Sequence, residues 1–157
     1  MGKAIRFSEK DVRTTGRATR GVKGIKLQKG DNVKDLVTVE KDASLLTVCE
    51  NGYGKRTEYN EYLVQNRGGM GVMNIKTSER NGNVVAIKNV GNEDALMMMT
   101  AKGMIIRTAV NAIRTIGRNT QGVKLISLDA GDKLVSVASA LNDDKDETSS
   151  EEDEVSS

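Results

Sequence analysis

The stretch TTGRATRGVKGIKL (residues 14–27) returns near the end of the chain as TIGRNTQGVKLISL (residues 115–128), 101 residues later. A catalytic motif is needed once, so a duplicated motif indicates a repeated structural unit. A third copy is therefore expected at the midpoint. VQNRGGMGVMNI (residues 64–75) occupies it, with Arg67 fifty residues after Arg17. The period of about fifty residues is in the range of propeller-like arrays.

The flanking residues follow the same spacing. NGYGKRTEYNEY (51–62) aligns with KGMIIRTAVNAI (102–113), and GKAIRFSEKDV (2–12) is a diverged copy. The second and third repeats open with SLLTVCE (44–50) and ALMMMTA (95–101), but the first has no counterpart. We therefore expect a fragment that begins inside a repeat. Its expected parts are an incomplete blade (1–44), a complete blade (45–94), a final blade (95–141) and a disordered acidic tail (142–157).

The repeats have the residue pattern of short β-strands. Seven β-branched or alternating runs are separated by Gly, Asn and Asp turns, and no segment has helical periodicity over ten residues. The runs are KAIRFSE (3–9), LVTVE (36–40), LLTVCE (45–50), GVMNIKT (71–77), VVAIKNV (84–90), GMIIRTA (103–109) and KLVSVAS (133–139). The second repeat alone gives four strands, near 45–50, 55–59, 71–77 and 84–90. The sequence thus predicts an all-β, propeller-like array of four-stranded blades that forms a partial ring.

Composition limits the function classes. The 157 residues include no His, no Pro and one Cys, which excludes an internal disulfide framework and a cysteine metal cluster. With no long apolar run and no signal-peptide pattern, we expect a cytoplasmic protein that makes no membrane contact. Residues 142–157 hold eight acids and one Lys of the chain's 22 acidic and 24 basic residues, which leaves residues 1–141 with a balance of +9. A basic body with an acidic tail suggests a polyanion partner and a tethered competitor for it.

The sequence offers no catalytic constellation. NRGGMG (66–71) lacks the Gly-Lys-Ser/Thr and the following helix of a phosphate loop. The counterparts of Glu58 and Glu61 in the third repeat are alanines, which favours solvated residues over an acid–base pair. Tyr62 aligns with two apolar positions, so we expect it in the core or at its rim. Cys49 aligns with a methionine and is expected to be a small buried apolar residue. We expect no metal and no cofactor in this chain.

Repeated cations are the strongest functional signal. Arg17, Arg67 and Arg118 recur at one loop position, and equivalent positions on successive blades should form a basic stripe suited to a row of phosphates. The alternative is that each Arg makes a local ion pair or covers an apolar edge. One Phe, three Tyr and no Trp leave few stacking platforms, which favours duplex over single-stranded DNA. The expected DNA-binding residues are Arg17, Arg20, Lys23, Lys26, Arg67, Lys76, Arg118 and Lys124.

The segments GRATRGVKGIKL (16–27), GYGKRTEYNEYLVQNRGGMGV (52–72), TSERNGNVVAI (77–87) and IRTIGRNTQGVKLISL (113–128), with the acidic tail, resemble the C-terminal domain of the bacterial DNA gyrase A subunit. The resemblance covers residues 2 to about 140 in unbroken order and is typical of the last blades. It implies a β-pinwheel whose strands are exchanged between neighbouring blades. It also implies that the basic rim wraps duplex DNA in a positive sense, which supports negative supercoiling.

In that family, an ATPase B subunit joins the rest of the A subunit in an A2B2 assembly that acts on the bacterial nucleoid and uses ATP and Mg²⁺. The family's active-site Tyr context is absent here, so the resemblance implies a non-catalytic part of a type II topoisomerase. QNRGGMG (65–71) resembles the family's Gln-Arg-Arg-Gly-Gly-Lys-Gly box, but Asn66 and Met70 replace two basic residues. Two alternatives remain open: the equivalent topoisomerase IV domain, or a propeller-like scaffold that binds an acidic protein.

Overall fold

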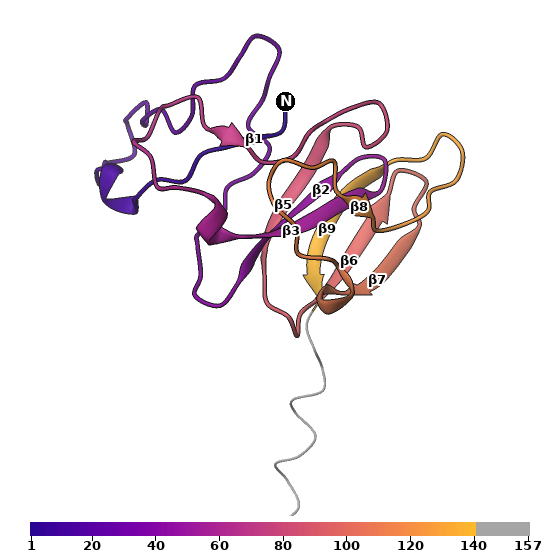
Figure 1. Ribbon diagram of the computed structural model, residues 1–157. Coiled ribbons are helices and arrows are strands. Elements are labelled where there is room, and N and C mark those ends of the chain that lie inside the picture. Colours follow the sequence, from indigo (N-terminus) through magenta and orange to yellow (C-terminus); the bar gives the residue numbers. More distant parts are fainter. Residues whose placement is uncertain (141–157) are drawn as a thin grey trace, which may run out of the picture.

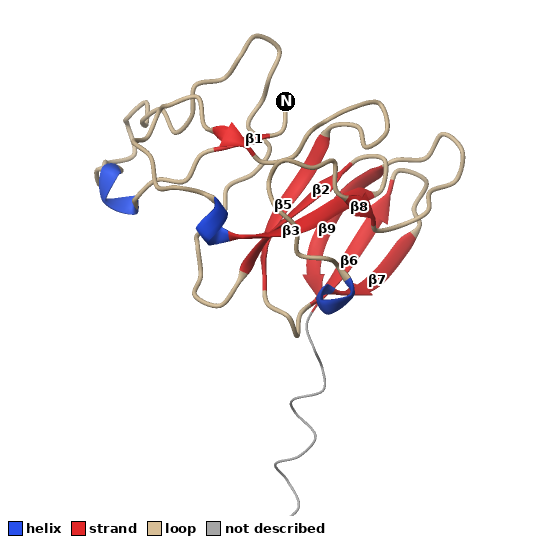
Figure 2. Cartoon of the chain, viewed as in Figure 1, coloured by secondary structure: helices blue, strands red, loops and turns tan. Residues whose placement is uncertain are grey.

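A computed structural model describes residues 1–140 of the chain (Figure 1). The predicted acidic tail lies outside the described residues. Strands and turns build the described part, and its helical segments are three single-turn 3-10 helices (Figure 2). These are η1 (Glu9–Asp11), η2 (Tyr59–Glu61) and η3 (Val110–Ala112). The all-β class predicted from the sequence is confirmed.

The strands form two sheets and one short pair, and all of the ladders are antiparallel. The first sheet has the order β5 (Val84–Val90), β2 (Ser44–Cys49), β3 (Tyr53–Glu58), β8 (Val123–Lys124). The second has the order β7 (Ile105–Ala109), β6 (Ala95–Thr100), β9 (Leu134–Ala140). The remaining pair joins β1 (Lys3–Ala4) to β4 (Val72–Met73).

Strands β4 and β8 pair outside their own repeats. β4 comes from the second repeat but pairs with β1 of the first, and β8 comes from the third repeat but pairs with β3 of the second. Three of the four strands predicted for the second repeat form within about two residues of the predicted bounds, whereas the predicted strand 71–77 is strand only at Val72–Met73, and the four do not share one sheet. Each copy of the repeat offers the same backbone to its neighbours, so the spacing of the strands does not reveal this exchange.

One predicted strand is wrong. Residues 36–40 form no β-ladder, and Leu36 and Val39 are exposed. Only Val37 in this run packs, against the cluster of Leu45, Tyr59 and Tyr62. A strand needs neighbouring backbone to satisfy its N–H and C=O groups, and no described strand pairs with this run. The predicted strand at 3–9 is shorter for a similar reason: it pairs only at Lys3–Ala4 and then turns into η1.

The core lies on both sides of the central strand β2. Leu46 and Val48 join a cluster with residues of β5, β6 and β9, including Leu96 and Val137. Leu45 points into a second cluster with Tyr59 and Tyr62. All six residues of β2 are buried, which explains why its sequence lacks polar alternation. In β6, by contrast, Leu96 and Met98 are fully buried whereas Met99 is 43% exposed, so the methionines lie on both faces of the strand.

The two contacts between successive repeats have the same geometry. The Ile75 amide donates to the Gly2 carbonyl at 3.0 Å, and the Ile126 amide, 51 residues later, donates to the Gly52 carbonyl at 3.2 Å. Gly2 and Gly52 both have positive φ, 61° and 80°, and a Cβ on either would meet the carbonyl oxygen of its partner. Glycine is therefore required where the exchanged segment crosses the neighbouring repeat.

Candidate nucleic-acid interface

The structure places six of the eight predicted cations on the surface and half-buries the other two. Four of the exposed residues come from the long loop of the first repeat, one follows β4, and one lies on β8. These exposed cations are Arg17, Arg20, Lys23, Lys26, Lys76 and Lys124. Their side chains make no hydrogen bond or ion pair to another residue within 1–140. They are therefore available to a ligand.

Arg67 and Arg118 instead tie neighbouring repeats together. The Arg67 guanidinium donates to the carbonyl of Lys23 in the first repeat and, through Nε, to the carbonyl of Asp11 at 3.2 Å. The Arg118 guanidinium donates to the carbonyl of Met73 in the second repeat at 2.9 Å. Lys23 and Met73 are fifty residues apart and hence equivalent. The same hydrogen bond thus recurs at both contacts between repeats, and this structural role explains why Arg is repeated at this position.

Arg118 also lies in a crowded polar environment. Its guanidinium carbon is 5.8 Å from the centre of the Tyr62 ring, and its Nε is buried without a hydrogen-bond partner among the described residues. The loop that carries it is held by the fully buried Lys55, whose Nζ donates to the carbonyls of Gly117 and Arg118, each at 2.7 Å. Desolvation, and then the charge of Arg118, lowers the pKa of Lys55 to about 8. Lys55 is therefore an internal anchor rather than a surface cation.

A second series of arginines links the repeats in the opposite direction along the chain. Arg6 donates to the carbonyl of Tyr59 at 2.8 Å. Arg56 donates through Nε to the carbonyl of Ile113 at 2.8 Å and through Nη1 to Asn92 Oδ1 at 2.6 Å. Each guanidinium reaches forward to the 3-10 turn of the following repeat. Arginine suits this task because its fixed fork of donors can bond several backbone acceptors at once.

The structure adds a cationic cluster that the sequence did not reveal. The guanidinium of the exposed Arg80 lies 4.8 Å from the centre of the Tyr53 ring, and Tyr53 pairs in register with Lys124 of the third repeat. A hydrogen bond from Arg80, and then the charges of Arg80 and Lys124, lowers the pKa of the Tyr53 phenol. Arg80 lies outside the repeated motif, so only its contact with Tyr53 could have drawn attention to it.

Asn81 fixes the loop that presents Arg80. Its buried side chain donates to the Lys76 carbonyl at 2.8 Å and to the Gln121 carbonyl at 3.0 Å, and it accepts from the Ser78 amide at 2.8 Å. One side chain thus closes the loop between β4 and β5 and joins it to the third repeat. A fixed loop holds its cations at a defined spacing.

The remaining candidates for chemistry are packed in the core. Desolvation raises the pKa values of Cys49, Tyr59 and Tyr62, each to about 12, which keeps all three groups neutral near pH 7. The burial of Cys49 confirms its expected core position, and Tyr62, expected in the core or at its rim, is buried as well. Within residues 1–140, no group of three or more His, Cys, Asp and Glu side chains could hold a metal ion.

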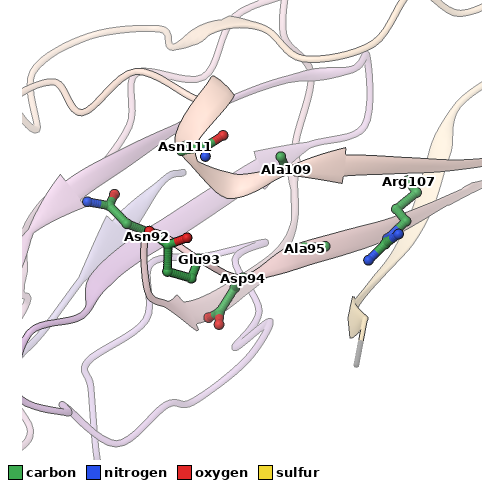
Figure 3. Close-up of a pocket in the computed structure, with 7 residues that line it drawn as sticks. All are labelled: Asn92, Glu93, Asp94, Ala95, Arg107, Ala109 and Asn111. Atoms are coloured by element: carbon green, nitrogen blue, oxygen red, sulfur yellow. The ribbon is translucent and has the colours of Figure 1, made fainter. Parts of the chain in front are cut away.

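An open hollow of about 350 Å³ lies beside the start of β6 and the end of β7 (Figure 3). Its lining comprises Asn92, Glu93, Asp94, Ala95, Arg107, Ala109 and Asn111. The Asp94 carboxylate accepts the Gly91 amide at 2.8 Å and so closes the turn before β6. No nucleophile with an adjacent base lies among these lining residues.

No helix in residues 1–140 is long and apolar enough to cross a membrane.

The sequence matches a known family along nearly all of the described part. The family described as "DNA gyrase C-terminal domain, beta-propeller" matches residues 2–40, 43–90 and 94–140. The DNA gyrase A subunit of Haloquadratum walsbyi is 51% identical over 138 residues, which are 87% of this chain and 16% of that protein. The DNA gyrase A subunit of Escherichia coli is 48% identical over 125 residues, which are 80% of this chain and 14% of that protein. The chain thus spans less than a fifth of these relatives.

Solved structures give the same result for the fold. A structure of the DNA gyrase A C-terminal domain superimposes with a TM-score of 0.83 at 33% identity and covers 89% of this chain and 48% of its own. The C-terminal domain of DNA topoisomerase IV superimposes with a TM-score of 0.81 at 24% identity and covers 88% of this chain and 43% of its own. The second likeness concerns the fold alone.

Proposed function

The chain belongs to the family of DNA gyrase C-terminal domains, and from this membership we propose that it binds and wraps duplex DNA without catalysing a reaction itself. The observation that supports this most is the presence, on all three repeats, of exposed cations whose side chains pair with no other residue within 1–140, such as Lys23, Lys76 and Lys124. Cations spaced along an array contact successive phosphates and supply affinity without reading bases.

The cations have two tasks in this proposal. The six exposed residues, together with Arg80, contact phosphates. Arg67 and Arg118 act mainly by holding the loops and the neighbouring repeats in place, because backbone carbonyls already take up part of each guanidinium. The path of the DNA then follows the relative orientation of the repeats, which these bonds set.

The wrapped segment would serve a larger enzyme. We infer that the chain works with the ATPase B subunit, together with the remainder of its own gyrase A subunit, in an A2B2 type II topoisomerase of the bacterial cytoplasm and nucleoid. ATP and Mg²⁺ would be used there, and this chain would need no cofactor. Positive wrapping presents a DNA crossing of fixed sign, so that strand passage by the catalytic core produces negative supercoils.

Two alternatives are less well supported. A topoisomerase IV domain would share the fold, but the relatives of high identity are gyrase subunits. A scaffold for an acidic protein would use the same exposed cations. These two ligands differ in charge density: duplex DNA carries a regular, dense row of phosphates with condensed counterions, whereas an acidic polypeptide does not.

The test measures affinity against salt concentration for three unrelated duplexes and for poly-glutamate. We expect similar affinities for the three duplexes and a steep log–log salt slope. Replacing Lys23, Lys76 and Lys124 with Ala should flatten that slope by about 2 to 3, roughly one unit for each phosphate that no longer has a cation beside it. An unchanged slope, or tighter binding of poly-glutamate than of duplex, would contradict the proposal. Ligation of nicked circular DNA with bound protein should give positively shifted topoisomers.

A further inference from the structure

The junction between the second and third repeats brings an aromatic ring and two cations together. Tyr53 begins β3 and stands opposite Lys124 of β8 in the antiparallel ladder that joins these repeats. The side chains of directly opposed residues lie on one face of a sheet, with Cβ atoms about 4.5–5.5 Å apart. Arg80 reaches the same ring from the loop between β4 and β5, with its guanidinium carbon 4.8 Å from the ring centre. We call Tyr53, Arg80 and Lys124 the junction site.

Arg80 comes from a loop whose backbone is held by both repeats. Asn51, in the turn before β3, donates to the Arg80 carbonyl at 3.3 Å. Asn81 ties the same loop to the third repeat by donating to the Gln121 carbonyl at 3.0 Å. The Arg80 side chain therefore starts from a fixed point, and its contact with Tyr53 restrains the guanidinium at the far end.

Both cations of the junction site are exposed and remain open to a ligand. Within residues 1–140, neither Arg80 nor Lys124 forms an ion pair with a carboxylate, whereas Lys133 is paired with Glu50 at 3.0 Å. A guanidinium carries five N–H donors in a fixed fork, so its contact with one phenol leaves donors for a bidentate bond to a phosphate. The Lys124 ammonium supplies a second positive charge beside the same ring.

The junction between the first and second repeats lacks this combination. There Lys3 of β1 stands opposite Met73 of β4, in the places of Tyr53 and Lys124. That pair thus holds one cation and no aromatic ring. The bond from Arg118 to a neighbouring carbonyl has an equivalent at the first junction, but the junction site has none. The joining of the repeats therefore does not explain the junction site.

We propose that Tyr53 is a positioning residue for DNA binding: its ring holds Arg80 beside Lys124, so that the two cations bind neighbouring phosphates of duplex DNA across the junction. This inference rests on the proposed function and assigns a task within it to an aromatic residue. An arginine that is held in place before binding loses less side-chain freedom when it meets a phosphate. Its contact is therefore stronger than that of a mobile arginine.

The test is a double-mutant cycle of Tyr53→Leu and Arg80→Ala in the 157-residue chain, with affinity for a duplex measured over a series of salt concentrations. Arg80→Ala should flatten the log–log salt slope by about 0.9, since one phosphate loses its cation. Tyr53→Leu should weaken binding about two- to tenfold, because one long side chain must then be ordered on binding. It should leave the slope nearly unchanged, because it removes no charge. In the Arg80→Ala background, Tyr53→Leu should have little further effect.

Tyr53→Phe is the matched control. It keeps the ring beside Arg80 and loses only the hydroxyl, so it should retain most of the affinity. Circular dichroism and Tm check that each variant folds as the wild type does. An equal loss for Tyr53→Phe and Tyr53→Leu would mean that the hydroxyl acts rather than the ring. An equal effect of Tyr53→Leu with and without Arg80 would mean that Tyr53 does not act through Arg80. Either result would overturn the proposal.

The combined Lys23, Lys76 and Lys124 variant separates this inference from the proposed function. If that variant flattens the slope as expected but the cycle shows no coupling, Tyr53 does not position Arg80, and DNA binding stands. If that variant leaves the slope unchanged, both proposals fail.

Discussion

Replacing Arg118 with Ala separates a structural role from a phosphate contact. The change removes a charged hydrogen bond to the Met73 carbonyl at 2.9 Å and a ring contact with Tyr62 at 5.8 Å. A charged hydrogen bond contributes about 1.5–3 kcal/mol, and a partly exposed cation–π contact about 0.5 kcal/mol. Because Arg118 is only half-buried, we expect the free energy of unfolding to fall by about 2 kcal/mol.

Thermal unfolding measures this destabilisation directly. For a chain of this size, about 2 kcal/mol corresponds to a lowering of Tm by roughly 4–8 °C. Arg114→Ala is the matched control, since it removes the same charge from an exposed side chain and should leave Tm nearly unchanged. Arg118→Lys should recover only part of the stability, because an ammonium lacks the planar fork of donors.

Duplex binding by the same variants completes the experiment. Lys124→Ala should flatten the log–log salt slope by about 0.9, with little effect on Tm. Arg118→Ala should change the slope much less, provided that binding is measured well below its Tm. If Arg118→Ala instead flattened the slope by about one unit and left Tm unchanged, Arg118 would be a phosphate contact and the assigned interrepeat role would be wrong.

Three further predictions concern pH, glycine and the tail. The pKa of Lys55 is about 8 in the folded chain and ordinarily 10.5, so between these pH values the unfolded chain binds more protons than the folded chain. The free energy of unfolding, relative to that of Lys55→Met, should therefore rise with pH from about 8 to 10.5. If urea melts show that the difference between the two proteins does not change with pH, the pKa of Lys55 is not lowered. Gly122→Ala should destabilise the chain more than Gly131→Ala, because both have positive φ but only Gly122 approaches a neighbouring carbonyl; an equal lowering of Tm would mean that φ alone matters. Removing residues 142–157 should tighten duplex binding at low salt, since a tethered polyanion competes with phosphates; equal affinities with and without the tail would make it a passive solubiliser.

Much of the fold could be predicted because it depends on side-chain patterns. The fifty-residue spacing of Arg17 and Arg67 predicted an array, and alternating runs predicted most strands within a few residues of their ends. Burial followed alignment as well: Tyr62 and Cys49 lie in the core, as their apolar counterparts in other repeats indicated. These features depend on the order of side chains along the sequence, so they can be predicted from the sequence alone.

The family resemblance implied that strands are exchanged between neighbouring repeats, but the residue pattern by itself did not identify the partners of β4 and of Arg118. β4 pairs outside its repeat through backbone groups, and the Arg118 guanidinium binds a backbone carbonyl. Almost every residue carries the same backbone donor and acceptor, so the amino-acid type of a residue does not show that its backbone binds another strand or side chain. The contact between Arg80 and Tyr53 was missed because Arg80 lies in a loop outside the repeated motif, so the sequence did not connect it with Tyr53.

The sequence by itself determined the period, the all-β class, the buried positions and the existence of a cationic surface, because each depends on which side chains recur and how far apart they stand. Only the tertiary structure decided which strands share a sheet and which arginines join the repeats rather than face the solvent. It also decided that residues 36–40 form no strand. These outcomes depend on which backbone edges meet in space, and backbone hydrogen bonding is the same for every sequence.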